Sequence, residues 1–224
     1  MNLKALPRMG RPLLIILALG AWAGLAHYGS AGHGNPDLSA ALGVAPLILA
    51  AALLWPGRSP GGMLFAAALA LGLVGLLWPR LRESVPLLYY IQHLGAHLAL
   101  GIFFGRTLRA ESTPLITQLA QAMSATELSA RKLRYTRRVT QVWTGYFLVN
   151  ALVSTLLFLF APREIWSFHA NILSWPLIAS LFLGEHLFRR RILPPEERPG
   201  VGEVIQAYLR ISRTQRNPAS STPP

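Results

Sequence analysis

Six apolar stretches, each free of lysine and arginine, constrain this chain more than any other feature. A helix that crosses a bilayer needs roughly 20 mostly apolar residues, because the hydrocarbon core is about 30 Å thick and offers the backbone no hydrogen bonds. The stretches cover approximately residues 12–28, 39–55, 62–78, 86–104, 140–161 and 166–188. Only the last contains an acid, Glu185. The sequence therefore predicts an all-α, polytopic membrane protein with six transmembrane helices.

The distribution of charge predicts the orientation of these helices. If the amino terminus lies in the cytoplasm, 18 of the 21 lysine and arginine residues fall on the inner side. This asymmetry follows the positive-inside rule, so we expect both termini in the cytoplasm. Orientation also explains the formal net charge of +12 without nucleic acid as a partner. The charged residues left on the outer side are Arg80, Arg82 and Arg163, matched by Asp37, Glu83 and Glu164.

The first apolar stretch allows two interpretations. Basic residues before it and small residues after it are also typical of a cleaved signal peptide. Its 17 uncharged residues exceed the usual apolar region of about 7–15 in such peptides, which favours a retained helix. Removal of this stretch would leave the direction of the other five spans unchanged, so orientation does not separate the two interpretations.

The inner side also holds the largest segments outside the predicted spans. Thr113 and Pro114 predict the N-cap and first residue of a short amphipathic helix on the membrane surface. Ser124 and Glu127 have capping-box spacing, which predicts the start of the next helix. That helix would carry a basic segment along the anionic inner leaflet, where each charge contributes on the order of 1 kcal/mol. Alternatively, the basic segment offers a site for an anionic substrate or an acidic carrier protein. The basic segment comprises Arg131, Lys132, Arg134, Arg137 and Arg138.

Together these patterns predict two parts of the chain. Residues 1–188 form a six-helix membrane domain that includes the cytoplasmic segment 105–139. Residues 189–224 form a basic cytoplasmic tail with a short amphipathic stretch over 201–211. The last residues, 213–224, have the composition of a disordered segment.

Polar side chains inside the predicted spans are candidates for function, because ionisable groups are costly in hydrocarbon. His93 and His97 share one helix face, which Gly101 and Gly105 continue. Such a pair can bind a metal or haem iron, or it can hydrogen-bond to neighbouring helices while the glycines permit close packing. No third ligand is evident, and the chain has no cysteine, so we favour the structural role and predict no metal or cofactor. The other intramembrane polar candidates are Asn150, His169 and Asn171.

Glu185 also has two interpretations. It precedes Arg189 by four residues, the spacing of a favourable helical ion pair. Alternatively, Glu185 and His186 combine with Arg106 and Arg109, which leave the fourth span at a similar depth, to hold a phosphate or carboxylate head group. In that case Arg106→Ala or Glu185→Ala should abolish function without loss of membrane insertion.

Six short segments between residues 103 and 191 carry a further pattern. They are residues 103–108 (FFGRTL), 113–117 (TPLIT), 135–140 (YTRRVT), 171–173 (NIL), 182–185 (FLGE) and 189–191 (RRR). Together they resemble a family of bacterial inner-membrane proteins of unknown biochemical function. The resemblance covers roughly residues 87–191 and supplies no catalytic residues. It implies a multi-pass protein of the inner membrane that is an accessory component of fatty-acid-like or polyketide-like pathways, such as aryl polyene and xanthomonadin synthesis.

The sequence and this resemblance lead to three hypotheses of function. The first is an accessory protein that handles or docks lipid-like acyl or polyene products, with membrane lipids and an acyl carrier protein or acyltransferase as partners. The second is a membrane-embedded acyl-transfer enzyme that uses His93, His97 or His186, although an acyltransferase-like His-x4-Asp pair is lacking. The third is a small-solute transporter, although the second and third spans hold few polar residues. We expect the first, without catalytic activity.

Overall fold

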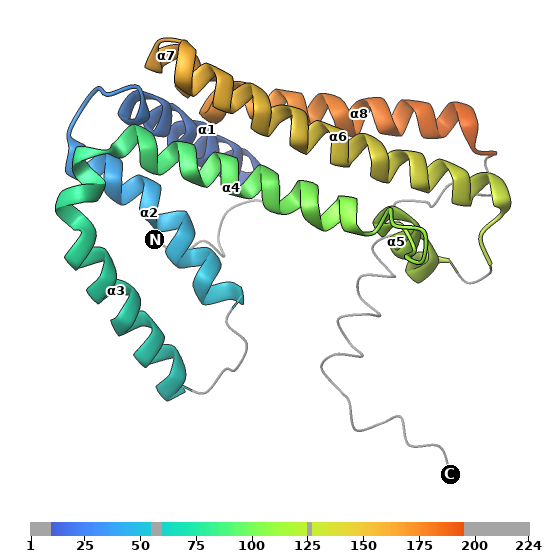
Figure 1. Cartoon of the computed structure of the whole chain (residues 1–224), viewed down its shortest axis with the longest axis horizontal. Helices are drawn as coiled ribbons and strands as arrows, with labels where there is room; N and C mark the ends of the chain where they lie inside the picture. Colours follow the sequence, from blue (N-terminus) through green and yellow to red (C-terminus); the bar gives the residue numbers. More distant parts are fainter. Residues whose placement is uncertain (1–9, 55–59, 125–126, 195–224) are drawn as a thin grey trace. The chain divides into compact units, whose positions relative to one another are not determined.

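Helices and the turns and loops between them make up the residues that the computed structural model describes, 10–54, 60–124 and 127–194 (Figure 1). The all-α prediction is therefore confirmed. The predicted helix over 201–211 and the disordered end lie outside the described residues. The helices are α1 (Gly10–Ser30), α2 (Pro36–Leu54), α3 (Pro60–Glu83), α4 (Val85–Arg106), α5 (Leu115–Met123), α6 (Ala130–Phe160), α7 (Arg163–Phe168), the π-helix η2 (His169–Leu173) and α8 (Ser174–Ile192).

Four helical segments among the described residues are long and apolar enough to cross a membrane, as expected of a membrane protein. They overlap the first, fourth, fifth and sixth predicted spans. The second and third predicted spans fall on α2 and α3, and the apolar stretch found in α2, Pro36–Ile48, is shorter. Six spans and their orientation thus stay a prediction. The four segments are Leu13–Ser30, Val85–Arg106, Ala130–Phe160 and Arg163–Ile192.

The contacts between residues divide the chain into two compact units. The first unit comprises residues 1–96 and 150–177, and the second comprises residues 97–149 and 178–224. Helices α1, α2, α3 and α7 belong to the first unit, and α5 belongs to the second. Each unit has its own buried cluster of apolar side chains.

The first unit is built around Trp166, which is fully buried. The indole packs with Ala26, Ala40 and Tyr89, and its Nε1 donates a hydrogen bond to Ser154 Oγ over 3.1 Å. The small alanine side chains let the helices approach closely, as at other helix contacts in membranes. Packing in this unit therefore depends on small residues that surround large aromatic rings.

A π-helical turn, η2, interrupts the helical segment that contains Trp166. It spans His169–Leu173, and the N–H of Ser174 reaches the carbonyl of His169 five residues back. Pro176 accounts for this widening, because proline has no N–H to donate to the carbonyl of Ile172 and its ring crowds that carbonyl. The turn directs Asn171 and His169 into the buried part of the unit.

The second unit is held by aromatic side chains of α6 and by the face of α4 that carries glycines. Trp143 and Phe147 are buried with Tyr135 in its core. On α4, a Cβ added to Gly101 would lie 2.9 Å from Leu148 Cδ2, so only glycine fits there without movement of its neighbour. His97 is buried, with its ring 6.0 Å from that of Phe147. The prediction that this face of α4 packs against protein is confirmed.

Candidate functional site

Helix α5 is held at its start by threonine side chains from other segments. The N–H of Leu115 donates to Thr107 Oγ1 over 3.0 Å, and the N–H of Ile116 donates to Thr140 Oγ1 over 3.3 Å. The first N–H groups of a helix have no partner within it, so these hydroxyls act as caps supplied by tertiary structure. Pro114, which occupies the N-cap position, makes no side-chain cap bond.

Two helix starts therefore differ from those predicted. Thr113 is not the cap of α5, because the helix begins at Leu115, one residue later than expected, and takes its caps from outside. The predicted capping box of Ser124 and Glu127 is also wrong: α6 begins only at Ala130. Ser129 caps this start, since its Oγ accepts a 3.1 Å hydrogen bond from the N–H of Lys132. A serine thus caps the helix, five residues later than the pattern indicated.

Further contacts fix α5 and the segment before it to the basic start of α6. Thr117 Oγ1 and Thr136 Oγ1 are 2.7 Å apart, and both side chains are buried. Arg137 Nη2 donates to the carbonyl of Leu108 over 3.0 Å. Because hydroxyl and guanidinium bonds join three segments, the space between those segments has defined walls.

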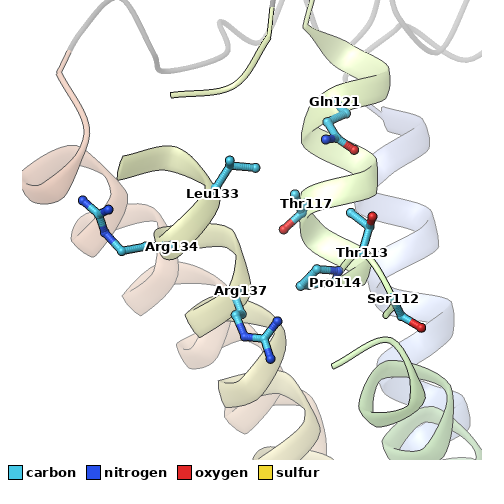
Figure 2. Close-up of a pocket in the computed structure, with 8 residues that line it drawn as sticks. All are labelled: Ser112, Thr113, Pro114, Thr117, Gln121, Leu133, Arg134 and Arg137. Carbon is cyan, nitrogen blue, oxygen red and sulfur yellow. The ribbon is translucent and has the colours of Figure 1, made fainter. Parts of the chain in front are cut away.

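A cavity of about 330 Å³ lies between α5, the segment before it and the start of α6 (Figure 2). Two of its lining side chains are guanidinium groups, three are hydroxyls and one is an amide, and none is acidic. Figure 2 shows Arg137 reaching from α6 toward the side on which Ser112, Thr113 and Thr117 lie. The lining residues are Ser112, Thr113, Pro114, Thr117, Gln121, Leu133, Arg134 and Arg137.

The positive charge beside this cavity is not neutralised by carboxylates within the described part of the chain. The ion pairs found there use Asp37, Glu164 and Glu185, none of which pairs with the basic segment of α6. Arg134 and Arg137 are exposed. A cavity with hydroxyl and guanidinium donors and no acid suits an anionic ligand, since arginine binds carboxylate and phosphate oxygens through paired N–H groups.

Glu185 forms the predicted ion pair with Arg189, and this prediction is confirmed. Tyr135 completes the contact, because its hydroxyl donates to Glu185 Oε1 over 2.9 Å. Arg189 Nε donates to the same oxygen over 3.0 Å, so Tyr135 and Arg189 together hold the carboxylate in place. The acid is therefore held within the second unit rather than presented to solvent.

The other candidates for a head-group site take no part in this ion pair. Arg106 is exposed and its guanidinium lies 5.0 Å from the ring centre of Phe103. Arg109 and His186 are also exposed. Among the described residues no ion pair joins Glu185 to Arg106 or Arg109. A ligand-binding role for these four residues stays a prediction, and no ion pair joins any two of them in the described part of the chain.

Polar side chains of the first unit form a buried network between α1 and the segment α7–η2. Ser167 Oγ lies 2.7 Å from Ser30 Oγ and 2.8 Å from His27 Nδ1, and it donates to the carbonyl of His27. Asn171 Nδ2 donates to Ser30 Oγ over 2.9 Å. Asn171 therefore makes the interhelical hydrogen bond predicted for it. Ser30 and Ser167 are fully buried, so these bonds replace the water that both hydroxyls lose on folding.

The intramembrane histidines have similar structural contacts. His93 Nε2 lies 3.1 Å from Ser174 Oγ, which confirms its predicted bond to a neighbouring helix. Its ring centre is 5.8 Å from that of His169, and His169 and Asn150 are both buried. The described residues contain no group of three or more side chains arranged as metal ligands.

Sequence reasoning missed two sets of residues. In the first unit it did not single out His27, Ser30 and Ser167, although two hydroxyls next to apolar runs were the available signal. In the second unit it assigned Arg134 and Arg137 to a basic segment that contacts lipid or an anionic partner, and it did not predict the cavity beside them. Their spacing of three residues places them on one side of a helix, which was the signal for a shared site.

Comparisons with known proteins found no relative of this chain. The chain matches no family model, no curated protein and no solved structure. The candidate site therefore depends on the geometry of the second unit.

Proposed function

We propose that this chain is an accessory protein of the bacterial inner membrane that docks lipid-like acyl or polyene products at its inner side. One observation carries the proposal: the basic segment of α6 lies beside an open cavity and pairs with no carboxylate among the described residues. A concentrated positive surface of this kind attracts anionic groups. On the inner side of a membrane it also meets anionic lipid headgroups.

Apolar side chains near the basic segment support an amphipathic ligand. Leu133 and Pro114 line the cavity together with the arginines. Leu119 on α5 is exposed, with 52% of its surface accessible. A ligand that carries an anionic head and an acyl chain would use both kinds of surface, because ligand sites combine apolar lining with a few placed polar groups.

The proposal includes six spans with both termini in the cytoplasm, because this orientation places the basic segment at the inner leaflet. Fusions of a reporter enzyme that is active only outside the cytoplasm test it. A fusion within residues 32–35 should be active, and one within residues 109–112 should be inactive. The reverse pattern would place the basic segment outside and contradict the proposal.

A deletion strain tests the pathway context. Loss of the chain should change the lipid and pigment extract of the bacterium that carries it, and expression of the native chain should restore the extract. The variant Arg131→Gln with Arg138→Gln should restore less than about half of the lost product, because it removes two positive charges from the basic segment of α6. The readout is the extracted product per cell, with protein amount in the membrane measured alongside.

The matched control removes two exposed arginines from the predicted outer side, Arg80→Gln with Arg163→Gln, and should restore the extract fully. An extract that deletion leaves unchanged would contradict the proposal and favour a small-solute transporter. Loss of product with both double variants would also contradict it, since the effect would then not depend on the inner side. A membrane-embedded acyl-transfer enzyme would instead lose activity when His93, His97 or His186 is replaced.

A further inference from the structure

We propose that the cavity between α5 and α6 binds a phosphate monoester group. This inference deepens the proposed function and rests on it, because it names the chemical class of the anionic head that the inner side would dock. The headgroup of phosphatidic acid and a soluble phosphate ester share this chemistry. The central residue is Arg137, and the hydroxyls of Ser112 and Thr113 and the amide of Gln121 complete the set of donors.

The balance of charge favours a dianion. Arg134 and Arg137 both line the cavity and no carboxylate does, and Figure 2 shows the Arg137 guanidinium directed toward α5 while that of Arg134 is directed away from it. A phosphate monoester carries about −1.5 to −2 charges near neutral pH, since its second pKa is about 6. A carboxylate or a phosphate diester carries only one negative charge and would leave one guanidinium without a counter-charge.

The placement of the donors on three segments favours a tetrahedral group over a planar one. They come from three segments: Arg137 from α6, Ser112 and Thr113 from the segment before α5, and Gln121 from α5 itself (Figure 2). A planar carboxylate pairs best with one guanidinium in a flat arrangement. A phosphate monoester has three terminal oxygens that point in different directions, so it accepts donors from several walls.

The walls are held in place without the ligand. Thr107 and Thr140 occupy the first N–H groups of α5, so the side chains, rather than the end of the helix, would supply donors to the ligand. The bond between Thr117 and Thr136 and the bond from Arg137 to Leu108 join the walls. Preorganised walls lower the entropic cost of binding.

The cavity has room for the head of such a molecule. A water molecule occupies about 30 Å³ in the liquid, so 330 Å³ corresponds to on the order of ten waters. A phosphate group and its first few carbon atoms fit this space. Arg134 is exposed on the same helix, one turn before Arg137, and its flexible side chain can turn toward the bound group.

Calorimetric titration of the full chain, purified in nonionic detergent, tests the inference. The probes are dihexanoyl phosphatidic acid and glycerol 3-phosphate, both monoesters, and dihexanoyl phosphatidylglycerol, a diester. We expect a monoester to bind at least about fivefold more tightly than the diester. Acidification from about pH 7.5 to about pH 5 should weaken the monoester and leave the diester unchanged, because only the monoester gains a proton in that range.

Variants of the cavity locate the binding. Arg137→Gln should lower the affinity for the monoester by about tenfold or more, and Arg137→Lys should give an intermediate value because it keeps the charge without the paired N–H groups. Since Arg137 also bonds to Leu108, Arg134→Gln is the second variant: Arg134 makes no hydrogen bond or ion pair with the described residues, and its loss should cost about threefold. Arg191→Gln, an exposed charge outside the cavity, should bind within about twofold of the native chain.

The outcomes separate the source of the phosphate from the inference itself. Tighter binding of phosphatidic acid than of glycerol 3-phosphate supports a lipid headgroup, and equal binding supports a soluble ester. Equal affinity for monoester and diester, or native affinity in both Arg137→Gln and Arg134→Gln, would overturn the inference. Neither result depends on the deletion strain, so loss of product there without phosphate binding here would refute this inference alone.

Discussion

In the first unit, Ser30, Ser167 and Asn171 direct their hydrogen bonds to one another, whereas in the second unit threonines hold the start of α5 beside two exposed arginines. Both regions use small polar side chains to join helices. The second unit also places charged side chains beside a cavity. Buried hydroxyl and amide groups that satisfy each other have no capacity left for a ligand, so they define structure, and the uncompensated charges mark the candidate site.

This comparison qualifies a common rule for membrane proteins. An ionisable or polar residue inside a span is by default a candidate for function, because it is costly in hydrocarbon. Here interhelical hydrogen bonds of His93 and Asn171 offset that cost. The cavity instead lies next to α5, a helix too short to cross a membrane, with nine residues.

The largest expected effect on stability comes from Ser167→Ala in the first unit. The change removes a fully buried hydroxyl and deprives His27 and Ser30 of a partner, which costs about 1–3 kcal/mol. The melting temperature of the purified protein, followed by tryptophan fluorescence, should fall by several degrees, while phosphate binding stays unchanged. Ser180→Ala, at an exposed position of α8, is the matched control and should melt like the native chain. Equal melting temperatures of the two variants would show that the network does not stabilise the fold.

A smaller and more local effect should follow Thr107→Val in the second unit. The change removes the acceptor of the Leu115 N–H and costs about 0.5–2 kcal/mol, in the range of a lost helix cap. Hydrogen exchange over α5 should accelerate, and monoester affinity should fall, because one wall of the cavity loosens. Thr144→Val is the control, since that hydroxyl bonds to a carbonyl one turn back in its own helix. Unchanged exchange in α5 would show that the tertiary caps do not position the helix.

The smallest effect is expected for Glu185→Gln. Arg189 is about one third exposed, with 31% of its side chain accessible, so water can replace part of the lost charge contact. The amide oxygen that replaces the carboxylate can still accept from Tyr135 and Arg189, so the expected cost is about 1 kcal/mol, the net contribution of a single hydrogen bond. The melting temperature should change little, and phosphate binding should stay native. A large loss of phosphate binding would instead support Glu185 as part of the head-group site that its sequence position suggested.

Much of the fold could be predicted because its cause is local. Runs of apolar residues predict helices of membrane length wherever no charge interrupts them, and the glycine face of α4 follows from helical periodicity. The helix starts were less predictable. Ser129 and Ser124 offer the same capping chemistry, and the contacts that select between such positions come from distant parts of the chain.

The candidate site was predictable only in its charge. The basic segment is visible in the sequence, but the cavity depends on the bond between Thr117 and Thr136, which are far enough apart that no spacing rule joins them. The first apolar stretch was likewise open between a signal peptide and a retained helix. Its hydrogen bonds from His27 and Ser30 to Ser167 favour retention, because its loss would strip buried polar groups of their partners.

By itself, then, the sequence determined an all-helical chain built for a membrane, with a strong excess of positive charge on one side of its predicted spans. These properties depend on composition and on distances of a few residues along the chain. Only the tertiary structure decided which polar groups form hydrogen bonds with neighbouring helices and which face open space. That outcome depends on contacts between residues up to about 140 positions apart, such as Ser30 and Ser167, whose hydrogen bond no local pattern specifies.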